Sequence, residues 1–135
     1  MQLPIIVIDD DTMHLTLIQR LMARLHKLDI EVIQDGALGF ERMNDLAISG
    51  DAAIILLDLN MPTMDGYDIL RQFKGDDKYN NLYIVVFSTS DEPEDIAFAL
   101  DCGVTGYLVK PTNHRLLRLK IDEITEKHQA KLQQS

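Results

Sequence analysis

The sequence predicts an α/β fold in which helices cover both faces of a parallel sheet. Five apolar segments rich in β-branched residues are typical of strands and recur along the chain, at residues 4–8, 30–33, 53–57, 83–87 and 106–109. Three runs within them are apolar at successive rather than alternate positions, namely 5–8, 54–57 and 84–87. Strands buried on both faces require such runs. Because helical segments separate the strands, the pattern predicts a doubly wound sheet with right-handed crossovers.

The first helical segment follows the first strand directly. Asp11 or Thr12 can cap its N-terminus by accepting backbone N–H groups of the first turn. The apolar side chains of this segment recur at helical spacing, which predicts one buried stripe made of Leu17, Ile18, Leu21, Met22 and Leu25.

A later helix is bounded by a proline and a glycine. Pro93 fits its first turn, and Gly103 can end it in a left-handed conformation. The apolar residues between these two positions are expected to lie on this helix, and they include Ile96, Ala97 and Leu100.

The last helix is expected to start at Thr112 or Asn113. Leu117, Ile121 and Ile124 then share one side of it. Apolar positions become sparse beyond His128, so we expect residues 1–126 to form one domain and residues 127–135 to be an extension of the last helix or a frayed tail.

Length and composition restrict the class of protein. A chain of 135 residues suits one compact domain, and none of its apolar runs approaches the roughly 20 residues that cross a bilayer. The start Met1-Gln2-Leu3-Pro4 lacks the basic residues of a secretory signal, so we expect a cytoplasmic protein with no membrane contact. The single Cys102 is expected to pack in the core. A net charge of −9 argues against a nucleic-acid partner.

Polar residues follow four of the predicted strands. In an open parallel sheet the ligand site lies beyond the carboxyl ends of the strands, so these side chains are expected to converge. They are Asp9, Asp10 and Asp11 after the first strand, Asp58 after the third, Ser88, Thr89 and Ser90 after the fourth, and Lys110 after the fifth.

This set of residues predicts a magnesium-dependent phosphoryl-transfer site. Converging carboxylates repel one another by roughly 4 kcal/mol per pair at 4 Å and an effective dielectric near 20, so a cation must balance them. We expect no His or Cys at the same edge of the sheet, and ligation by oxygen atoms alone favours Mg²⁺ over zinc. Asp58 can attack phosphorus, while Ser88 and Lys110 can bind the oxygens of a phosphoryl group.

The remaining histidines and methionines suggest no further chemistry. His14, His26, His114 and His128 show no metal-ligand spacing, and we expect them on the surface. Met61 and Met64 flank Pro62 and are expected to pack beneath their loop.

Four fragments, in this order and spacing, resemble the receiver domain of bacterial two-component response regulators over almost the whole chain. They are Val7-Ile8-Asp9-Asp10, the segment 58–66, Ser88-Thr89-Ser90 and the segment 103–111. The resemblance implies a stand-alone, chemotaxis-regulator-like receiver with a flavodoxin-like fold, five helices and the strand order 2-1-3-4-5.

The resemblance also implies roles for individual residues. Asp58 would accept a phosphoryl group from a histidine kinase or a histidine phosphotransfer protein, in a phosphoacceptor that turns over only by slow self-catalysis rather than as an enzyme. Mg²⁺ would bind to Asp9, Asp10 and Asp58, together with the backbone carbonyl of Asn60. Ser88 and Lys110 would hold phosphoryl oxygens, and the Lys110–Pro111 peptide would be cis.

Other implied roles concern output and lifetime. Tyr107 resembles the aromatic switch, whose inward movement in this family reshapes the face made by the fourth helix, the fifth strand and the fifth helix. That face, with the basic residues Arg115, Arg118 and Lys120, is expected to bind a downstream protein or a second copy of the chain. The first helix is the expected kinase dock. The lifetime of the phosphate would be tuned by Asn60, Thr89 and Ser90.

Two alternative functions remain at this point. A haloacid-dehalogenase-type phosphatase also forms an aspartyl phosphate, and the segment 9–13 almost fits its Asp-x-Asp-x-Thr/Val opening. However, Met13 misses the last position, and no acidic pair follows Lys110. The other alternative is a receiver-like interaction module that acts without phosphorylation.

Overall fold

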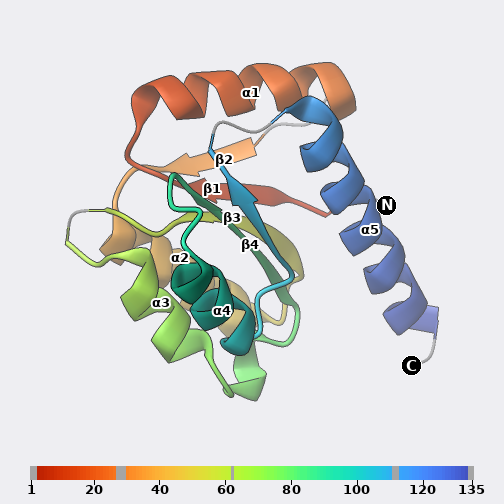
Figure 1. The fold of residues 1–135 in the computed structure, drawn as a ribbon. Helices are drawn as coiled ribbons and strands as arrows, with labels where there is room; N and C mark the ends of the chain where they lie inside the picture. The colour runs from red at the N-terminus through yellow and green to blue at the C-terminus, as the bar shows by residue number, and fades with distance from the viewer. Residues whose placement is uncertain (1–2, 27–29, 62, 111–112, 134–135) are drawn as a thin grey trace.

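Strand and helix alternate along the chain, as the sequence predicts, in the computed structural model (Figure 1). The structure describes residues 3–26, 30–61, 63–110 and 113–133. The strands are β1 (Ile5–Ile8), β2 (Ile30–Ile33), β3 (Ala53–Asp58), β4 (Leu82–Ser88) and β5 (Gly106–Val109). The helices are α1 (Thr12–His26), α2 (Gly36–Ser49), α3 (Gly66–Phe73), the short 3₁₀ helix η1 (Asp77–Tyr79), α4 (Pro93–Asp101) and α5 (His114–Gln133).

The strands form one parallel sheet in the order β2-β1-β3-β4-β5. This confirms the predicted fold class and strand order. The order in which strands are added to the sheet changes side at β1. Strand β2 lies on one side of β1 and β3 lies on the other, so Ile5 pairs with both Ile30 and Ile54. Ligands bind at such a switch point in doubly wound sheets, because the loops after the two strands diverge there.

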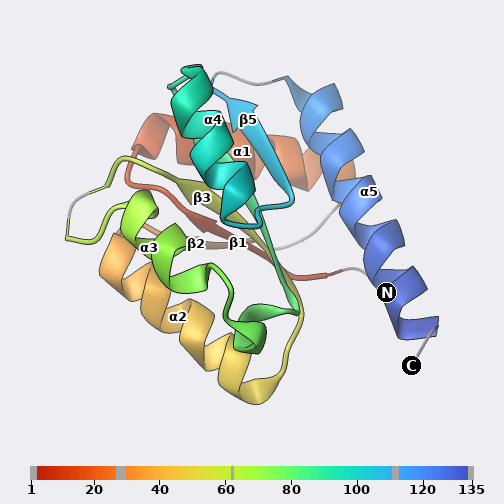
Figure 2. The same cartoon turned by 60° about the horizontal axis from the view of Figure 1, so that its bottom comes forward.

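Alternate residues of the central strands supply two separate cores. Ile6, Ile8, Ile55 and Leu57 face α2, α3 and α4. Ile5, Val7, Ile54 and Leu56 belong to the other core, between the sheet and helices α1 and α5. Figures 1 and 2 show this division of the helices between the two faces. Strands β1, β3 and β4 are buried throughout, and helices cover both of their faces. This explains why their apolar runs are uninterrupted.

Helix α1 begins where the sequence predicts, but its buried face differs in part. Asp11 caps the helix by accepting the backbone N–H groups of Met13 and His14 at 3.1 and 3.2 Å. The buried residues include Leu15, Ile18 and Met22. The prediction was wrong for Leu17, which is 43% exposed, because the buried face of the helix is centred on Leu15, Ile18 and Met22 and leaves Leu17 at its edge. The side chain of Leu25 lies outside the described residues.

Helix α4 has the predicted ends. Pro93 is its first residue, and Gly103, just beyond the helix, has φ of +93°. Glycine is the residue most favourable in this left-handed position, because it has no Cβ. Ala99 faces the core, whereas Leu100 is 53% exposed and contributes to the outer surface. Cys102 is buried in the core, as expected.

Helix α5 also has the predicted N-cap and buried side. Asn113 accepts the backbone N–H of Leu116 at 3.0 Å, and the three predicted core residues Leu117, Ile121 and Ile124 are buried. The helix continues to Gln133, and His128 Nδ1 lies 2.9 Å from the hydroxyl of Tyr83 on β4. The domain boundary after residue 126 remains a prediction. Of the described helices, none is long and apolar enough to cross a membrane.

Candidate functional site

The predicted site residues lie at the carboxyl edge of the sheet. Asp9 directly follows β1, Asp58 and Ser88 are the last residues of β3 and β4, and Lys110 directly follows β5. The parallel register places Asp58 opposite Phe87, and the backbone N–H of Lys110 donates to the carbonyl oxygen of Ser88 at 2.7 Å. Strand pairing therefore brings these four loop starts together.

Three carboxylates form a group that could hold a metal ion. One oxygen each of Asp9, Asp10 and Asp58 lies within 4.8 Å of the others. Asp9 and Asp58 are 1% and 5% exposed, whereas Asp10 faces solvent. Carboxylate oxygens with one open side suit a hard cation that keeps water ligands, and Mg²⁺ is the usual such ion. The donor set therefore fits the predicted cofactor.

Lys110 lies between the two buried acids. Its Nζ is 2.8 Å from Asp9 Oδ2 and 3.6 Å from Asp58 Oδ2, and its side chain is largely buried. The lysine can therefore neutralise one of the buried charges and remain close to the other. Pro111 lies outside the described residues, and so does the predicted cis peptide.

The two buried acids have opposite pKa shifts. Burial and the neighbouring charge of Asp9 raise the pKa of Asp58 to about 6, against the opposing effect of Lys110. Burial also acts to raise the pKa of Asp9, but hydrogen bonds from His14, Lys110 and the backbone of Asp11 outweigh it and hold this pKa below its ordinary value. Asp9 is thus the better-stabilised anion of the pair.

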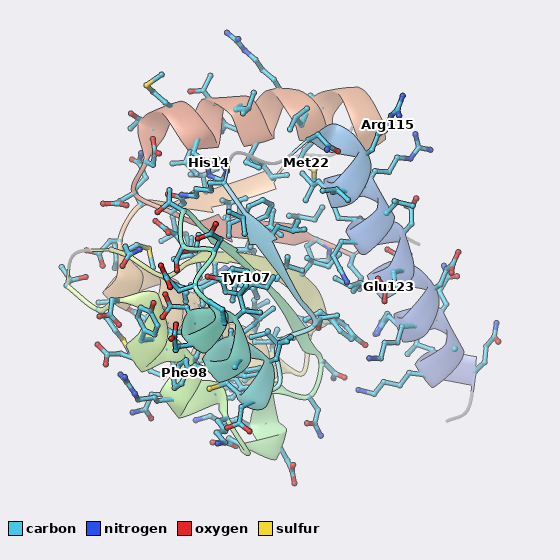
Figure 3. The ribbon with its side chains drawn as sticks, viewed as in Figure 1. His14, Met22, Phe98, Tyr107, Arg115 and Glu123 are labelled. Atoms are coloured by element: carbon cyan, nitrogen blue, oxygen red, sulfur yellow. The ribbon has the colours of Figure 1, made fainter. Side chains whose placement is uncertain are left out.

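His14 contradicts two of our expectations. It was predicted to be a surface residue, but it is 7% exposed and its Nδ1 lies 2.6 Å from Asp9 Oδ2. It was also expected that no histidine would lie at this edge of the sheet. Figure 3 shows His14 and Met22 on the side of α1 that faces the sheet. The sequence did contain a signal for this burial, because His14 lies four positions before Ile18 on the same side of the helix. Histidine is polar, however, so the position was not counted in the apolar stripe.

The loop after β3 is held close to the site. The backbone N–H of Gly66 donates to Leu59 O at 2.8 Å, and a Cβ on Gly66 would lie 2.5 Å from Asp58 O, so only glycine fits. Thr63 has φ of +67° and donates to Asp35 Oδ2 at 3.0 Å. Sequence reasoning did not find this tether. Met61 and Met64 pack against the core, as predicted.

The residues after β4 form a hydrogen-bonded chain toward α4 and β5. The buried Ser88 hydroxyl accepts the backbone N–H of Ser90 at 3.1 Å. The Tyr107 hydroxyl donates to Ser90 O at 3.0 Å, and Ser90 Oγ donates to Asp95 Oδ2 at 2.5 Å. Tyr107 is therefore linked to the Ser88 segment through the backbone.

The lifetime-tuning candidates lie around the opening of the site. Thr89 is exposed and lines a groove beside α1 and Lys110, and Ser90 is half-buried. The backbone N–H of Asn60, an exposed residue, is 3.4 Å from Asp58 Oδ1.

Comparison with protein families identifies the domain. The model of the response regulator receiver domain matches residues 5–122. The chain belongs to this family. Receiver domains are signalling phosphoacceptors that histidine kinases or phosphotransfer proteins phosphorylate. The resemblance stated from the four fragments is thereby confirmed, and the phosphatase alternative has no support.

Two relatives illustrate the family. The receiver is 32% identical over 125 residues to the probable methanogenesis regulatory protein FilR2 of Methanothrix harundinacea, covering 90% of this chain and 81% of FilR2. It is 25% identical over 120 residues to the chemotaxis protein CheY1 of Helicobacter pylori, covering 89% of this chain and 94% of CheY1.

Solved structures share the fold. The phosphorylated cyanobacterial phytochrome response regulator RcpA superposes with a TM-score of 0.72 at 29% identity, covering 93% of each chain. The receiver domain of the histidine kinase PA1611 from Pseudomonas aeruginosa shares the fold, with a TM-score of 0.75 at 19% identity over 91% of this chain and 97% of that one. Its structure holds a magnesium ion in the active-site cleft. In this chain, the carboxylate group of Asp9, Asp10 and Asp58 fits the predicted Mg²⁺ cofactor.

Proposed function

We propose that this receiver is a phosphorylation switch in which Asp58 accepts a phosphoryl group from a histidine kinase or a histidine phosphotransfer protein. One observation carries the proposal: Asp58 ends a buried strand, shares a three-carboxylate group with Asp9 and Asp10, and lies 3.6 Å from Lys110. A purely structural carboxylate would have more hydrogen-bond donors than the Asn60 backbone and this lysine.

The proposed reaction is a single displacement at phosphorus. A carboxylate oxygen of Asp58 forms a new P–O bond while the P–N bond of the phosphohistidine breaks, and the bonding electron pair stays on the imidazole nitrogen. Ser88 donates its hydroxyl to one phosphoryl oxygen, and Lys110 neutralises charge on another. The protein thus contributes position and charge rather than an enzymatic turnover, and release of the phosphate is slow and self-catalysed.

Asp9, Asp10 and Asp58 would hold Mg²⁺, with the Asn60 carbonyl as a further ligand. When bound, the ion stabilises negative charge on the transferring group. Asn60, Thr89 and Ser90, at the opening of the site, would set how easily water reaches the acyl phosphate and therefore how long it lasts.

The switch would act through Ser88 and Tyr107. Phosphorylation would redirect the Ser88 hydroxyl, to which the Ser90 segment and Tyr107 are already linked by hydrogen bonds. Such a switch shifts a pre-existing equilibrium between two surfaces.

The affected surface would be the face of α4, β5 and α5. It exposes four apolar side chains, Leu100, Val109, Leu116 and Leu119, next to the basic residues Arg115 and Arg118. This mixture of apolar and basic groups suits a downstream protein target or a second copy of the chain, rather than nucleic acid.

The kinase or phosphotransfer protein would dock on α1. A groove of about 620 Å³ runs beside this helix and reaches Lys110 and Thr89. Met13 is 83% exposed and Leu17 43%, and both line the groove together with Arg20. An apolar helix face next to the nucleophile is a suitable contact for a phosphate donor that must bring its histidine to Asp58.

Incubation with acetyl phosphate and Mg²⁺ tests the proposal. We expect one phosphate per chain, detected by intact mass or by mobility on a phosphate-affinity gel, and loss of the label in Asp58→Asn. Ser88→Ala and Lys110→Met should lower the rate by about 10²-fold or more, because each removes a group that binds the transferring phosphoryl. Thr12→Ala, on the exposed start of α1, is the matched control.

A chain that stays unlabelled, or that is labelled equally in Asp58→Asn, would contradict the proposed phosphoacceptor. If partner binding and cellular output are the same for the unsubstituted chain and Asp58→Asn, the receiver would instead be a phosphorylation-independent interaction module.

A further inference from the structure

We propose that His14 is a positioning residue, which fixes the carboxylate of Asp9 for metal binding. This inference rests on the proposed function, because it concerns the same divalent cation. His14 was not among the residues expected to act at the site, and its role follows from contacts that the structure shows.

The hydrogen bond between the two residues has a defined direction. An ionised Asp9 can only accept, so His14 must donate through Nδ1–H to Oδ2, over 2.6 Å. The other oxygen, Oδ1, accepts the backbone N–H of Asp11 at 2.9 Å. Each carboxylate oxygen therefore has its own donor, which fixes the orientation of the carboxylate plane.

Lys110 cannot perform this task alone. Its Nζ lies near both buried acids, 2.8 Å from Asp9 and 3.6 Å from Asp58, so it is shared between them. In the proposed mechanism the lysine also binds a phosphoryl oxygen. The imidazole ring of His14, by contrast, has Asp9 as its single hydrogen-bond partner among the described residues, while the backbone N–H of His14 donates to Asp11 Oδ1.

The burial of His14 argues against a role in packing alone. Its Nε2 is buried and has no hydrogen-bond partner in the described structure. An unpaired buried nitrogen costs about 1 to 3 kcal/mol. The ring packs against Phe87, with centroids 5.4 Å apart, and an apolar side chain would fill that place without this cost. The polar group is therefore useful through Nδ1, on the side of Asp9.

Residues that orient a metal ligand typically change metal affinity by about 10- to 100-fold when they are removed. Two substitutions separate positioning from packing. His14→Asn keeps a nitrogen donor on the same Cγ but leaves a cavity. His14→Leu fills the space more fully and removes the unpaired Nε2, but it has no donor.

The experiment measures Mn²⁺ binding by the EPR signal of free Mn²⁺, confirms it with Mg²⁺ by calorimetry, and measures urea unfolding in chelator. We expect His14→Leu to be at least as stable as His14→Asn but to bind the metal about 10-fold more weakly than the unsubstituted chain. His14→Asn should bind within about threefold of the unsubstituted chain despite its lower stability. If His14 acted only through packing, metal affinity would follow stability, and His14→Asn would bind the metal more weakly than His14→Leu.

The outcomes distinguish this inference from the proposed function. Unchanged affinity in His14→Leu, or equal losses in both variants, would overturn the role of His14 while metal binding and phosphorylation of Asp58 stand. Absence of Mn²⁺ and Mg²⁺ binding by the unsubstituted chain would overturn both.

Discussion

Asp9 and Asp58 belong to the same carboxylate group but differ in the donors around them. Asp9 accepts hydrogen bonds from His14 and the backbone of Asp11 and pairs closely with Lys110. Among the described residues, Asp58 has only the Asn60 N–H at 3.4 Å and the more distant Lys110 as donors. An oxygen with few donors keeps its lone pairs available for attack on phosphorus, so hydrogen bonding favours the proposed roles of Asp9 as metal ligand and Asp58 as nucleophile.

Replacing Asp58 with Asn should stabilise the fold near neutral pH. The pKa of about 6 exceeds the ordinary value of 3.8, so the folded state favours the protonated acid. This favourable contribution is complete below about pH 4 and is lost as the pH rises through about 6. In chelator at about pH 7.5, we expect Asp58→Asn to increase the free energy of unfolding by on the order of 1 to 2 kcal/mol.

Urea unfolding followed by circular dichroism across this pH range measures the effect. The gain should shrink toward zero near pH 4. The exposed Asp10 supplies a control, because Asp10→Asn should gain less. A variant less stable than the unsubstituted chain at about pH 7.5 would show that Asp58 is not destabilised by its surroundings.

The burial of His14 was not predicted because of its residue type. It lies four positions before Ile18, at the spacing of the buried face, yet a histidine does not count toward an apolar stripe. Its partner Asp9 is five residues away, and the bond depends on the turn between β1 and α1. Tertiary geometry therefore decided this contact, whereas Asp9, Asp10, Asp58, Ser88 and Lys110 could be located because each follows a recognisable strand.

The start of α4 depends on a side chain from the preceding loop. Glu92, the N-cap residue, makes no side-chain capping hydrogen bond within the described part of the chain. Instead, Asp95 in the first turn accepts from Ser90 Oγ, and this bond, with a further one from Tyr67, holds the pKa of Asp95 below its ordinary value. The segment after β4 is thereby attached to α4, which forms part of the face that the proposed switch affects.

Ser90→Ala should raise the pKa of Asp95 toward 3.8, because the hydrogen bond from Ser90 is the largest cause of its lowering. A carboxyl group whose pKa is lowered by folding stabilises the folded state at pH values above its ordinary pKa. This contribution is lost as the pH falls through the pKa of the folded state. Carboxyl ¹³C shifts measured from about pH 2 to 6 would detect the change. Ser49→Ala, which removes a similar bond to Asp51, should leave Asp95 unaffected. An unchanged Asp95 would contradict the link.

The elements themselves were predicted well where the pattern was continuous. Uninterrupted apolar runs such as 54–57 have few alternatives to a buried strand. The tether between Asp35 and Thr63 had no such signal, because the two residues are 28 positions apart and neither belongs to a periodic segment. The exposure of Leu17 and Leu100 could not be predicted for a similar reason, since a helical stripe has uncertain edges until its partner surface is known.

The whole domain separates its cores from its chemistry. One apolar layer lies on each face of the sheet, and the candidate metal ligands lie at the edge formed by the carboxyl ends of its strands. A cation at this edge should therefore stabilise the folded state by simple linkage, without repacking either layer.

Thermal unfolding with and without Mg²⁺ tests this arrangement. At a free concentration about ten times the dissociation constant, Mg²⁺ should add about 1.4 kcal/mol to the free energy of unfolding. Asp10→Asn should abolish most of the gain while leaving the stability in chelator nearly unchanged, because Asp10 is exposed. Chloride salt at matched ionic strength controls for screening. Equal stabilisation of Asp10→Asn by Mg²⁺ would place the ion elsewhere.

The single thiol of the chain is chemically protected. Cys102 is 3% exposed, and burial raises its pKa, so little reactive thiolate is available. Ile48, near the C-terminal end of α2, is 86% exposed. A cysteine introduced there would react selectively with maleimide dyes, at the end of α2 that leads into the amino end of β3. The native protein thus provides a background on which fluorescent reporters could follow phosphorylation without blocking the reacting centre.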